Sequence, residues 1–168
     1  MATLVRALRR ETPNTLFVLG GDTLSPSVFS TLFQGRQMIE AWNLLGLDAA
    51  VFGNHEFDFG PAVLRQRMAE SRFPWLGANV LDPGTRRPWG GAQTALLREW
   101  SGMRVGLVGV TMPRAARVSN PGPSIVFEPA PKGAERALAD LGSLDLRVAL
   151  THLELEQDRA LARAVSST

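Results

Sequence analysis

The chain has no cysteine, only two histidines and a single lysine, Lys132, among its 18 basic residues. Without cysteine there are no disulfide bonds, thiol nucleophiles or cysteine-ligated metals, although this absence does not identify a compartment. The arginines are scattered, and the tightest pairs are Arg9-Arg10 and Arg86-Arg87. A nucleic-acid surface needs a basic stripe with interleaved aromatic residues, so we expect no nucleic-acid partner.

Long apolar runs are also absent. None approaches the roughly 18 to 20 residues of a membrane span, so we predict no spanning helix. The N-terminus does not have the pattern of a signal peptide, because charges interrupt any apolar core. The spacing of Leu4, Val5 and Leu8 instead predicts an amphipathic helix. A length of 168 residues with 45% hydrophobic and 20% charged residues is typical of one globular domain, or most of one.

Four short apolar runs predict buried strands, because central parallel strands are covered on both faces. These runs occupy residues 15–19, 49–52, 105–110 and 146–150. Helical patterns alternate with them at residues 35–45, 61–71 and 130–141. Residues 79–100 are interpreted as a loop leading into an extra strand or hairpin at the sheet edge. This alternation predicts an α/β layered fold with a mostly parallel sheet flanked by helices.

Polar residues suited to chemistry follow three of the four predicted strands. Asp22 comes after the first strand, Asn54 and His55 after the second, and His152 after the fourth, whereas the third ends at Thr111 without a good ligand. Ligands of parallel α/β sheets bind beyond the carboxyl ends of the strands. A carboxylate, an amide and an imidazole suit divalent metals such as Zn, Mn, Fe or Co.

Each of these residues also has a simpler interpretation when it is taken alone. Asp22 could be a turn residue or a helix cap, and Asn54 with its neighbour could form a left-handed turn. His152 could be an ordinary histidine at a strand end, and Glu56 and Asp58 could be ordinary surface acids. The joint arrangement at three strand ends favours a functional site.

Several segments resemble the calcineurin-like metallophosphoesterases, and more narrowly the 5'-nucleotidase and UDP-sugar hydrolase branch. The motifs are GGDTLSPS at residues 20–27, GNHEFDFG at 53–60 and ALTHL at 149–153. The phrases LGLDAAVFGNHEFD and FPWLGANV are also characteristic of that branch. The resemblance extends over essentially the whole chain, with the motifs in the family's order.

The resemblance implies a role for five residues. Asp22 corresponds to a carboxylate that bridges two divalent metal ions, and Asn54 and His152 correspond to ligands of the second metal. His55 corresponds to the residue that contacts the phosphate and stabilises or protonates the leaving group. Asp58 corresponds to its partner, which orients the imidazole and favours its protonated form. The metals could be Zn, Mn, Fe or Co.

Two motifs of the family, Asp-x-His and Gly-His-x-His, do not occur in the sequence. The resemblance therefore implies that residues 1–168 are a partial catalytic domain, truncated at both ends and lacking the family's C-terminal nucleotide-specificity domain. For this chain alone we expect little or no activity and, at best, weak binding of one metal. An exposed sheet edge would also make it marginally stable or prone to associate.

The predicted function of the complete protein is metal-dependent hydrolysis of a small-molecule phosphoester, with a nucleotide as the expected substrate. A second interpretation is a catalytically incompetent fragment, or a binding module that reuses the fold. A third is a metal-free nucleotide-binding α/β domain, although the sequence has neither a GxGxxG opening a helix after the first strand nor a Walker A motif. Members of the family are often periplasmic or secreted, but the chain itself assigns no compartment.

Overall fold

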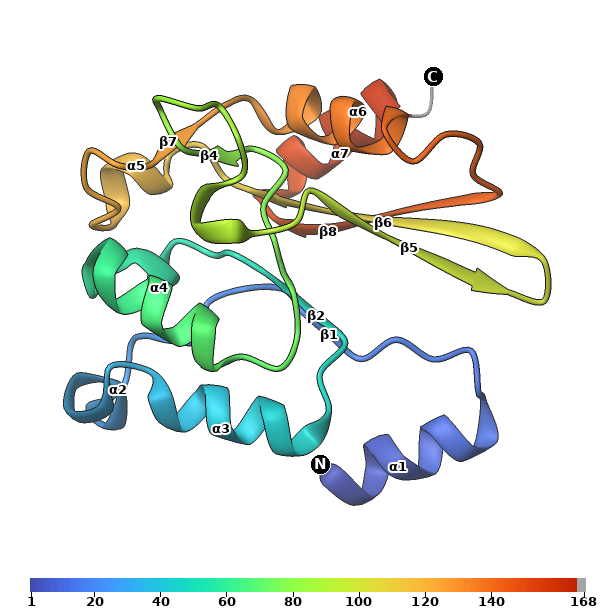
Figure 1. The fold of residues 1–168 in the computed structure, drawn as a ribbon, viewed down its shortest axis with the longest axis horizontal. Coiled ribbons are helices and arrows are strands. Elements are labelled where there is room, and N and C mark those ends of the chain that lie inside the picture. The colour runs from blue at the N-terminus through green and yellow to red at the C-terminus, as the bar shows by residue number, and fades with distance from the viewer. Residues whose placement is uncertain (166–168) are drawn as a thin grey trace.

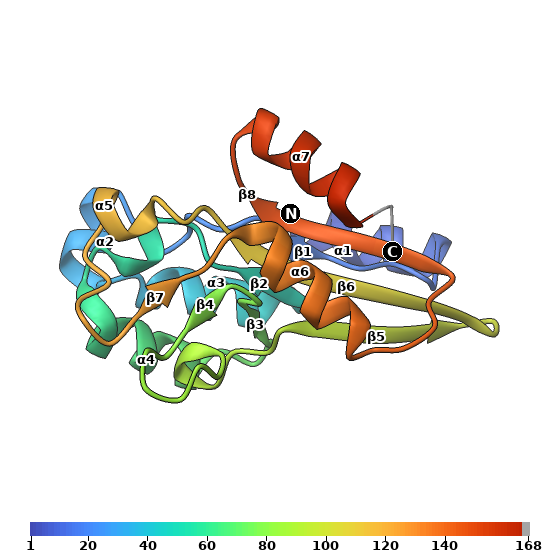
Figure 2. The same cartoon turned by 90° about the horizontal axis from the view of Figure 1, so that it is seen from above.

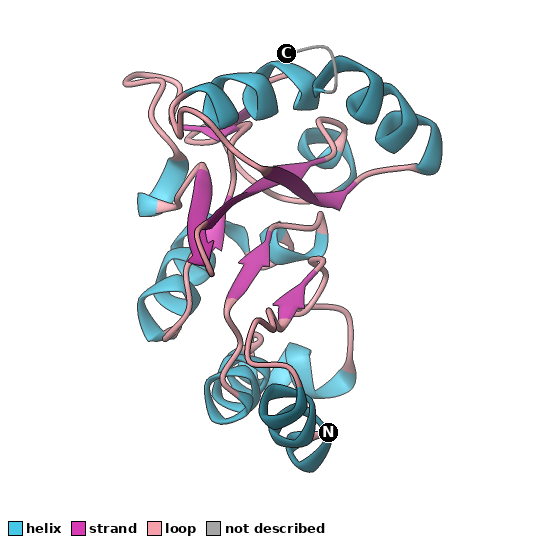
Figure 3. Cartoon of the chain, turned by 90° about the vertical axis from the view of Figure 1, so that its right-hand side faces the viewer, coloured by secondary structure: helices cyan, strands magenta, loops and turns pink. Residues whose placement is uncertain are grey.

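Two β-sheets lie face to face at the centre of the structure, and helices cover their outer faces (Figures 1 and 3). The computed structural model describes residues 1–165. The first sheet is entirely parallel and consists, in spatial order, of β1 (Val18–Leu19), β2 (Ala49–Val51) and β3 (Trp75–Leu76). The second sheet is mixed and consists of β5 (Ala95–Trp100), β6 (Met103–Thr111) and β8 (Leu146–His152). In it, β6 pairs antiparallel with β5 and parallel with β8.

The helices form two outer layers (Figures 1 and 2). Beside the parallel sheet lie α1 (Ala2–Glu11), α2 (Val28–Phe33), α3 (Arg36–Leu45) and α4 (Gly60–Glu70). Beside the mixed sheet lie α6 (Ala130–Ala139) and α7 (Leu155–Val165). Shorter elements occupy the connections: the 3₁₀ turns His55–Phe57 and Trp89–Gly91, α5 (Ala115–Val118), and the antiparallel pair β4 (Val80–Leu81) and β7 (Val126–Phe127). No helix within residues 1–165 has the length and apolar character needed to cross a bilayer.

Three apolar clusters hold these layers together. Residues such as Ile39, Phe52 and Leu64 bury α3 and α4 against the parallel sheet. Val108, Leu138 and Leu161 belong to the cluster between the mixed sheet and its two helices. A third cluster lies between the sheets, where Ala49, Leu76, Leu96 and Leu107 are all buried. The order of layers is therefore helix, sheet, sheet, helix, as expected when both faces of each sheet carry apolar side chains.

Most of the elements predicted from sequence are confirmed. The four predicted strands correspond to β1, β2, β6 and β8, and the three helical patterns correspond to α3, α4 and α6. The amphipathic N-terminal helix is also present as α1, although Val5 is its only buried residue. Residues 79–100 do lead into an edge hairpin, which β5 and β6 form across a turn at Ser101 and Gly102, both with positive φ.

Two strand predictions are wrong about burial. Val18 and Leu19 of β1 are only half-buried, and β8 departs further from the prediction. β8 was expected to be covered on both faces, but Leu146 and Val148 are 49% and 36% exposed. Within the described residues β8 pairs on one side only, with β6, so it is an edge strand rather than a central one. An apolar run predicts a strand from its composition, whereas its burial depends on which segments lie beside it.

A buried asparagine connects the second sheet to the short pair of strands. The Asn79 side-chain amide donates to the carbonyl oxygens of Thr111 and Glu128, at 2.7 and 3.0 Å, and its oxygen accepts from the Thr111 N–H at 2.9 Å. The Thr111 hydroxyl in turn donates to the carbonyl oxygen of Phe52 at 2.6 Å. These bonds fix the carboxyl end of β6 beside the carboxyl end of β2.

Candidate active site

The carboxyl ends of β1, β2 and β8 meet at one edge of the molecule, and the candidate residues meet there. One oxygen of the Asp22 carboxylate (Oδ1) accepts a hydrogen bond from the backbone N–H of His55 at 3.0 Å. Its other oxygen (Oδ2) lies 3.2 Å from Nε2 of His152. Residues that are 33 and 130 positions from Asp22 in the sequence therefore converge on a single carboxylate.

Glycines allow the two turns to approach this closely. A Cβ atom on Gly21 would lie 2.6 Å from the backbone nitrogen of Gly53 and 2.8 Å from Nδ1 of His152. A Cβ atom on Gly53 would overlap the carboxylate of Asp22. Gly21 and Asp22 both have positive φ, of 90° and 58°, a conformation that glycine adopts freely and aspartate tolerates. The turn after β1 thus places the Asp22 carboxylate against the backbone of the turn after β2.

Hydrogen bonding fixes the orientation of the His152 ring. Its Nδ1 lies 2.8 Å from the carbonyl oxygen of Gly20, which can only accept, so Nδ1 carries a proton. Nε2 then faces Asp22 Oδ2 across 3.2 Å. A neutral ring would place a nitrogen lone pair against a carboxylate oxygen, and either a second ring proton or a cation would satisfy both atoms. An Nδ1–H bond to a carbonyl is also the usual way in which a metal-binding histidine is held.

The second histidine is paired with a different carboxylate. Nδ1 of His55 lies 2.7 Å from Asp58 Oδ2, and the two side chains are 34% and 26% exposed. The hydrogen bond to Asp58 raises the pKa of His55 above its ordinary value, and the charges of Asp22, Asp58 and Glu56 add to this effect, while burial opposes it. The ring is therefore biased towards its protonated form, with Nε2 turned away from the Asp58 bond.

Asn54 lies at the start of the 3₁₀ turn, where its carbonyl oxygen accepts from the backbone N–H of Phe57 at 3.2 Å, and it is half-buried. Within residues 1–165, no group of three or more His, Cys, Asp or Glu side chains is close enough together to hold a metal ion. The donors that do face each other, Asp22 and His152, have chemistry suited to a divalent metal but form only part of a coordination shell.

Glu56 differs most from expectation. Taken alone it was interpreted as a surface acid, but its side chain is fully buried. Its two oxygens accept four backbone N–H bonds, from Asp22, Thr23, Leu24 and Gly53, at 2.8, 2.6, 3.2 and 2.5 Å. Burial raises the pKa of Glu56, and these four donors oppose the rise. Only the bond from Gly53, at the i, i+3 spacing of a capping box, has a local sequence signal, and the three bonds from residues 22–24 have none.

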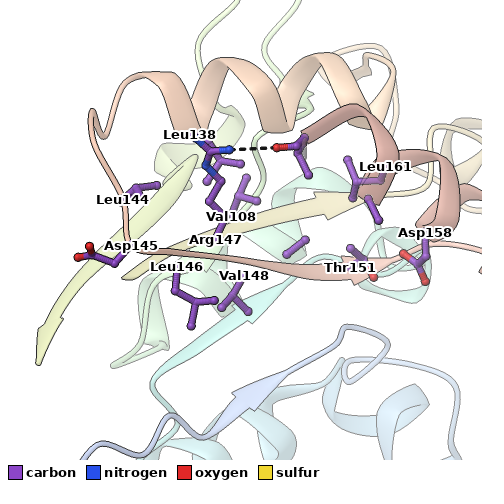
Figure 4. A pocket seen from close by; sticks show the side chains of 13 residues that line it. Val108, Leu138, Leu144, Asp145, Leu146, Arg147, Val148, Thr151, Asp158 and Leu161 are labelled. Atoms are coloured by element: carbon purple, nitrogen blue, oxygen red, sulfur yellow. Dashed lines mark hydrogen bonds between the residues drawn. The ribbon is translucent and has the colours of Figure 1, made fainter. Parts of the chain in front are cut away.

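A hollow of about 720 Å³ lies elsewhere, between β8 and helices α6 and α7. Figure 4 shows Arg147 directed into it from β8, with its guanidinium bonded to the carbonyl oxygen of Val165, while Leu146 and Val148 point to the opposite side of the strand. The described residues that line it include Thr151 but none of the five candidate site residues. The candidate site is therefore a surface arrangement at the strand ends, distinct from this hollow.

Known proteins with similar sequence and structure identify the relatives of the chain. No family model matches it. The mouse 5'-nucleotidase is 32% identical over 168 residues, which cover 97% of this chain and 29% of that protein. The 5'-nucleotidase precursor from Thermus thermophilus superposes with a TM-score of 0.87 at 30% identity, over 96% of this chain and 32% of that one. This chain is a relative of the 5'-nucleotidases.

A phosphoesterase of Bacillus subtilis is also similar, in sequence and in structure. The trifunctional nucleotide phosphoesterase YfkN of Bacillus subtilis is 29% identical over 197 residues, covering 97% of this chain and 14% of that protein. The structure of a calcineurin-like phosphoesterase, also YfkN, superposes with a TM-score of 0.74 at 22% identity, which supports the fold alone. The α/β fold with mostly parallel sheets is thus that of the 5'-nucleotidase relatives. The chain spans about 29% of the length of the mammalian relatives that it matches.

Proposed function

We propose that residues 1–168 form part of the catalytic domain of a metal-dependent phosphoester hydrolase of the 5'-nucleotidase type. The observation that carries this proposal is the convergence of Asp22, His55 and His152 at the carboxyl ends of three strands. Similarity to 5'-nucleotidases over 97% of the chain supports it. A nucleotide, or a related small phosphoester, is the substrate class that follows from those relatives.

In this proposal Asp22, Asn54 and His152 are metal ligands. Asp22 and His152 already present an oxygen and a nitrogen 3.2 Å apart, and the proton on Nδ1 of His152 leaves Nε2 available for a cation. Divalent metal ions, when bound at such a site, polarise phosphoryl oxygens and lower the pKa of water. Zn, Mn, Fe and Co all suit this donor set, and two such ions in the complete protein would need further ligands.

His55 and Asp58 are assigned the acid–base role. The Asp58 carboxylate accepts from Nδ1 of His55 and favours the protonated ring, so Nε2 can donate a hydrogen bond or a proton to the oxygen that leaves phosphorus. No covalent nucleophile is assigned among the residues of the site. General acid catalysis by a positioned side chain contributes about 10²–10⁴-fold to a rate, which sets the expected loss in a His55 variant.

The experiment uses this chain and, where the reading frame continues on either side of it, the correspondingly longer protein. Both are assayed with AMP and an aryl phosphate in the presence of Mn²⁺. We expect Asp22→Asn and Asn54→Ala to abolish turnover, and His55→Ala to reduce kcat by about 10²–10⁴-fold. Glu99→Gln is the control, because Glu99 pairs with Arg104 on the exposed β5–β6 hairpin. Wild-type turnover in Asp22→Asn would refute the assignment.

A second candidate is a non-catalytic binding module. The observation that favours it is the small number of donors brought together: residues 1–165 contain no group of three or more His, Cys, Asp or Glu side chains that could hold a metal ion. In that case a longer protein would bind nucleotide without hydrolysing it, and chelation of metal would leave the binding unchanged. Loss of binding on addition of EDTA would exclude this candidate.

A further inference from the structure

A fully buried carboxylate lies directly behind the candidate site and has no role in the proposed chemistry. Glu56 follows His55 in sequence, yet its side chain points away from solvent and is completely inaccessible. One oxygen, Oε1, accepts from the backbone N–H groups of Thr23 and Leu24, and Oε2 accepts from those of Asp22 and Gly53. An ionised carboxylate has about four acceptor positions, so all of them are filled.

The three donors in the first turn are consecutive. Asp22, Thr23 and Leu24 direct their N–H groups at the same carboxylate, because Gly21 and Asp22 both have positive φ. Successive N–H groups in a turn of this kind form a nest, a concavity that binds anions. Here the anion is a side chain of the same protein, supplied by the segment that follows β2. The Glu56 carboxylate therefore joins two turns that are more than 30 residues apart in sequence.

The connection is reciprocal. Glu56 holds the backbone of Asp22, while the Asp22 side chain accepts from the backbone N–H of His55 at 3.0 Å. Gly53, immediately before Asn54, donates to Glu56 at 2.5 Å. The positions of Asp22, Asn54 and His55 relative to one another are thus set by a closed ring of hydrogen bonds that passes through Glu56.

We propose that Glu56 is a positioning residue, whose buried carboxylate binds the backbone of residues 22–24 and 53 and so fixes Asp22 opposite His55 and His152. The proposal deepens the proposed function and rests on it for its catalytic meaning. Without the carboxylate, four buried N–H groups lose their acceptor, and buried donors of this kind require a partner. The turn after β1 is then free to separate from the turn after β2, which moves the Asp22 carboxylate away from both imidazoles.

The test compares Glu56→Gln with the wild-type chain by NMR. The chain has only two histidines, so its imidazole signals report on the two sides of Asp22 without overlap. We expect Glu56→Gln to shift both sets of imidazole signals and to accelerate amide exchange at residues 22–24 and 53 by about tenfold or more, the change that loss of one hydrogen bond produces. Glu56→Asp keeps the charge but is one methylene shorter, so an intermediate effect is expected.

Glu128→Gln is the matched control. Glu128 is also buried, at 5% exposure, and is paired with Arg136 at 2.5 Å, but it belongs to the β7–α6 connection rather than to either turn. It should lower the global stability while leaving the imidazole signals and the exchange pattern of residues 22–24 and 53 as in the wild type. Unchanged signals and exchange in Glu56→Gln, or equal changes in Glu128→Gln, would overturn the proposal. If Glu56→Gln does not fold, the Glu56→Asp comparison decides on the same signals.

Metal binding is tested separately, with Mn²⁺ as the probe. In the wild-type chain we expect Mn²⁺ to broaden the imidazole signals of both histidines, since both residues lie beside Asp22. A loss of at least about tenfold in the apparent Mn²⁺ affinity in Glu56→Gln supports both the proposed site and the positioning role. No broadening in the wild-type chain or in its extended form would contradict the metal site. The amide exchange and imidazole shifts would still decide whether Glu56 positions Asp22.

Discussion

Gly53 is the position where a single methyl group would disturb the candidate site most directly. A Cβ atom there would overlap the Asp22 side chain and lie 2.6 Å from the Asp22 backbone nitrogen and 2.8 Å from its Cγ, distances that real Cβ atoms do not show. Neither turn can yield easily, because both are tied to Glu56. Overpacking of a close-packed contact costs about 1–3 kcal/mol, which we expect for Gly53→Ala. For a domain of this size that loss corresponds to a fall in Tm of about 2–12 °C.

Gly20→Ala is the matched control, since Gly20 lies in the turn after β1. Its backbone does not have positive φ, and the nearest atom to an added Cβ is the carbonyl oxygen of Thr151 at 4.0 Å. It should be neutral or stabilising by up to about 1 kcal/mol, because alanine restricts the unfolded chain. Urea unfolding measures the difference in the free energy of unfolding between the two variants, provided that their m-values agree. Stabilities within about 0.5 kcal/mol of each other would refute the close approach of the two turns.

Three further perturbations have definite expected outcomes. Asp58→Ala should lower the pKa of His55, because Asp58 raises that pKa above the ordinary value of about 6.5. The stability that the His55–Asp58 pair provides is therefore fully present below about pH 6.5, and it is lost as the pH rises through the pKa of His55 in the folded protein. NMR titration of the His55 ring measures that pKa, and equal values in the variant and wild type would contradict the pairing. Asn79→Ala removes the partners of buried groups on Thr111 and Glu128 and should reduce the free energy of unfolding by at least about 2 kcal/mol, a loss that denaturant titration would detect or exclude. Val148→Lys places a charge on the exposed β8 strand and should reduce any self-association seen by sedimentation velocity, whereas association equal to wild type would show that this strand is not the contact.

The layered α/β fold was predictable because its signals are local. β2 and β6 are runs of apolar residues that end in turn residues, and α3 is bounded by Gly35 and Gly46, both in the left-handed conformation. The division of the strands into two facing sheets was not predictable in the same way. It depends on contacts between distant segments, such as the burial of Leu76 against Leu107, which no local pattern specifies. Strands of two residues, such as β3 and β4, are too short to have a recognisable period.

The candidate site was also predictable only in part, because some of its contacts join segments that are distant in the sequence. The positions of Asp22, Asn54 and His152 after strands predicted a common location, and the structure brings Asp22 and His152 within 3.2 Å. Their roles as ligands are still predictions. The burial of Glu56 was missed because an acidic residue between a histidine and a phenylalanine has no compositional signal of burial. Its environment is made by the backbone of another turn, which the sequence around Glu56 does not contain.

Metal content, measured beside AMP hydrolysis, decides whether the strand-end residues form a catalytic metal site. It is measured on this chain and on the longer protein that an extended reading frame encodes. We expect the extended protein to retain about two Mn²⁺ or Zn²⁺ ions and to hydrolyse AMP, whereas residues 1–168 bind at most one ion weakly and show little or no turnover. If the extended protein retains no metal and its phosphatase activity is absent or unaffected by a chelator, the assignment of Asp22, Asn54 and His152 as metal ligands is wrong.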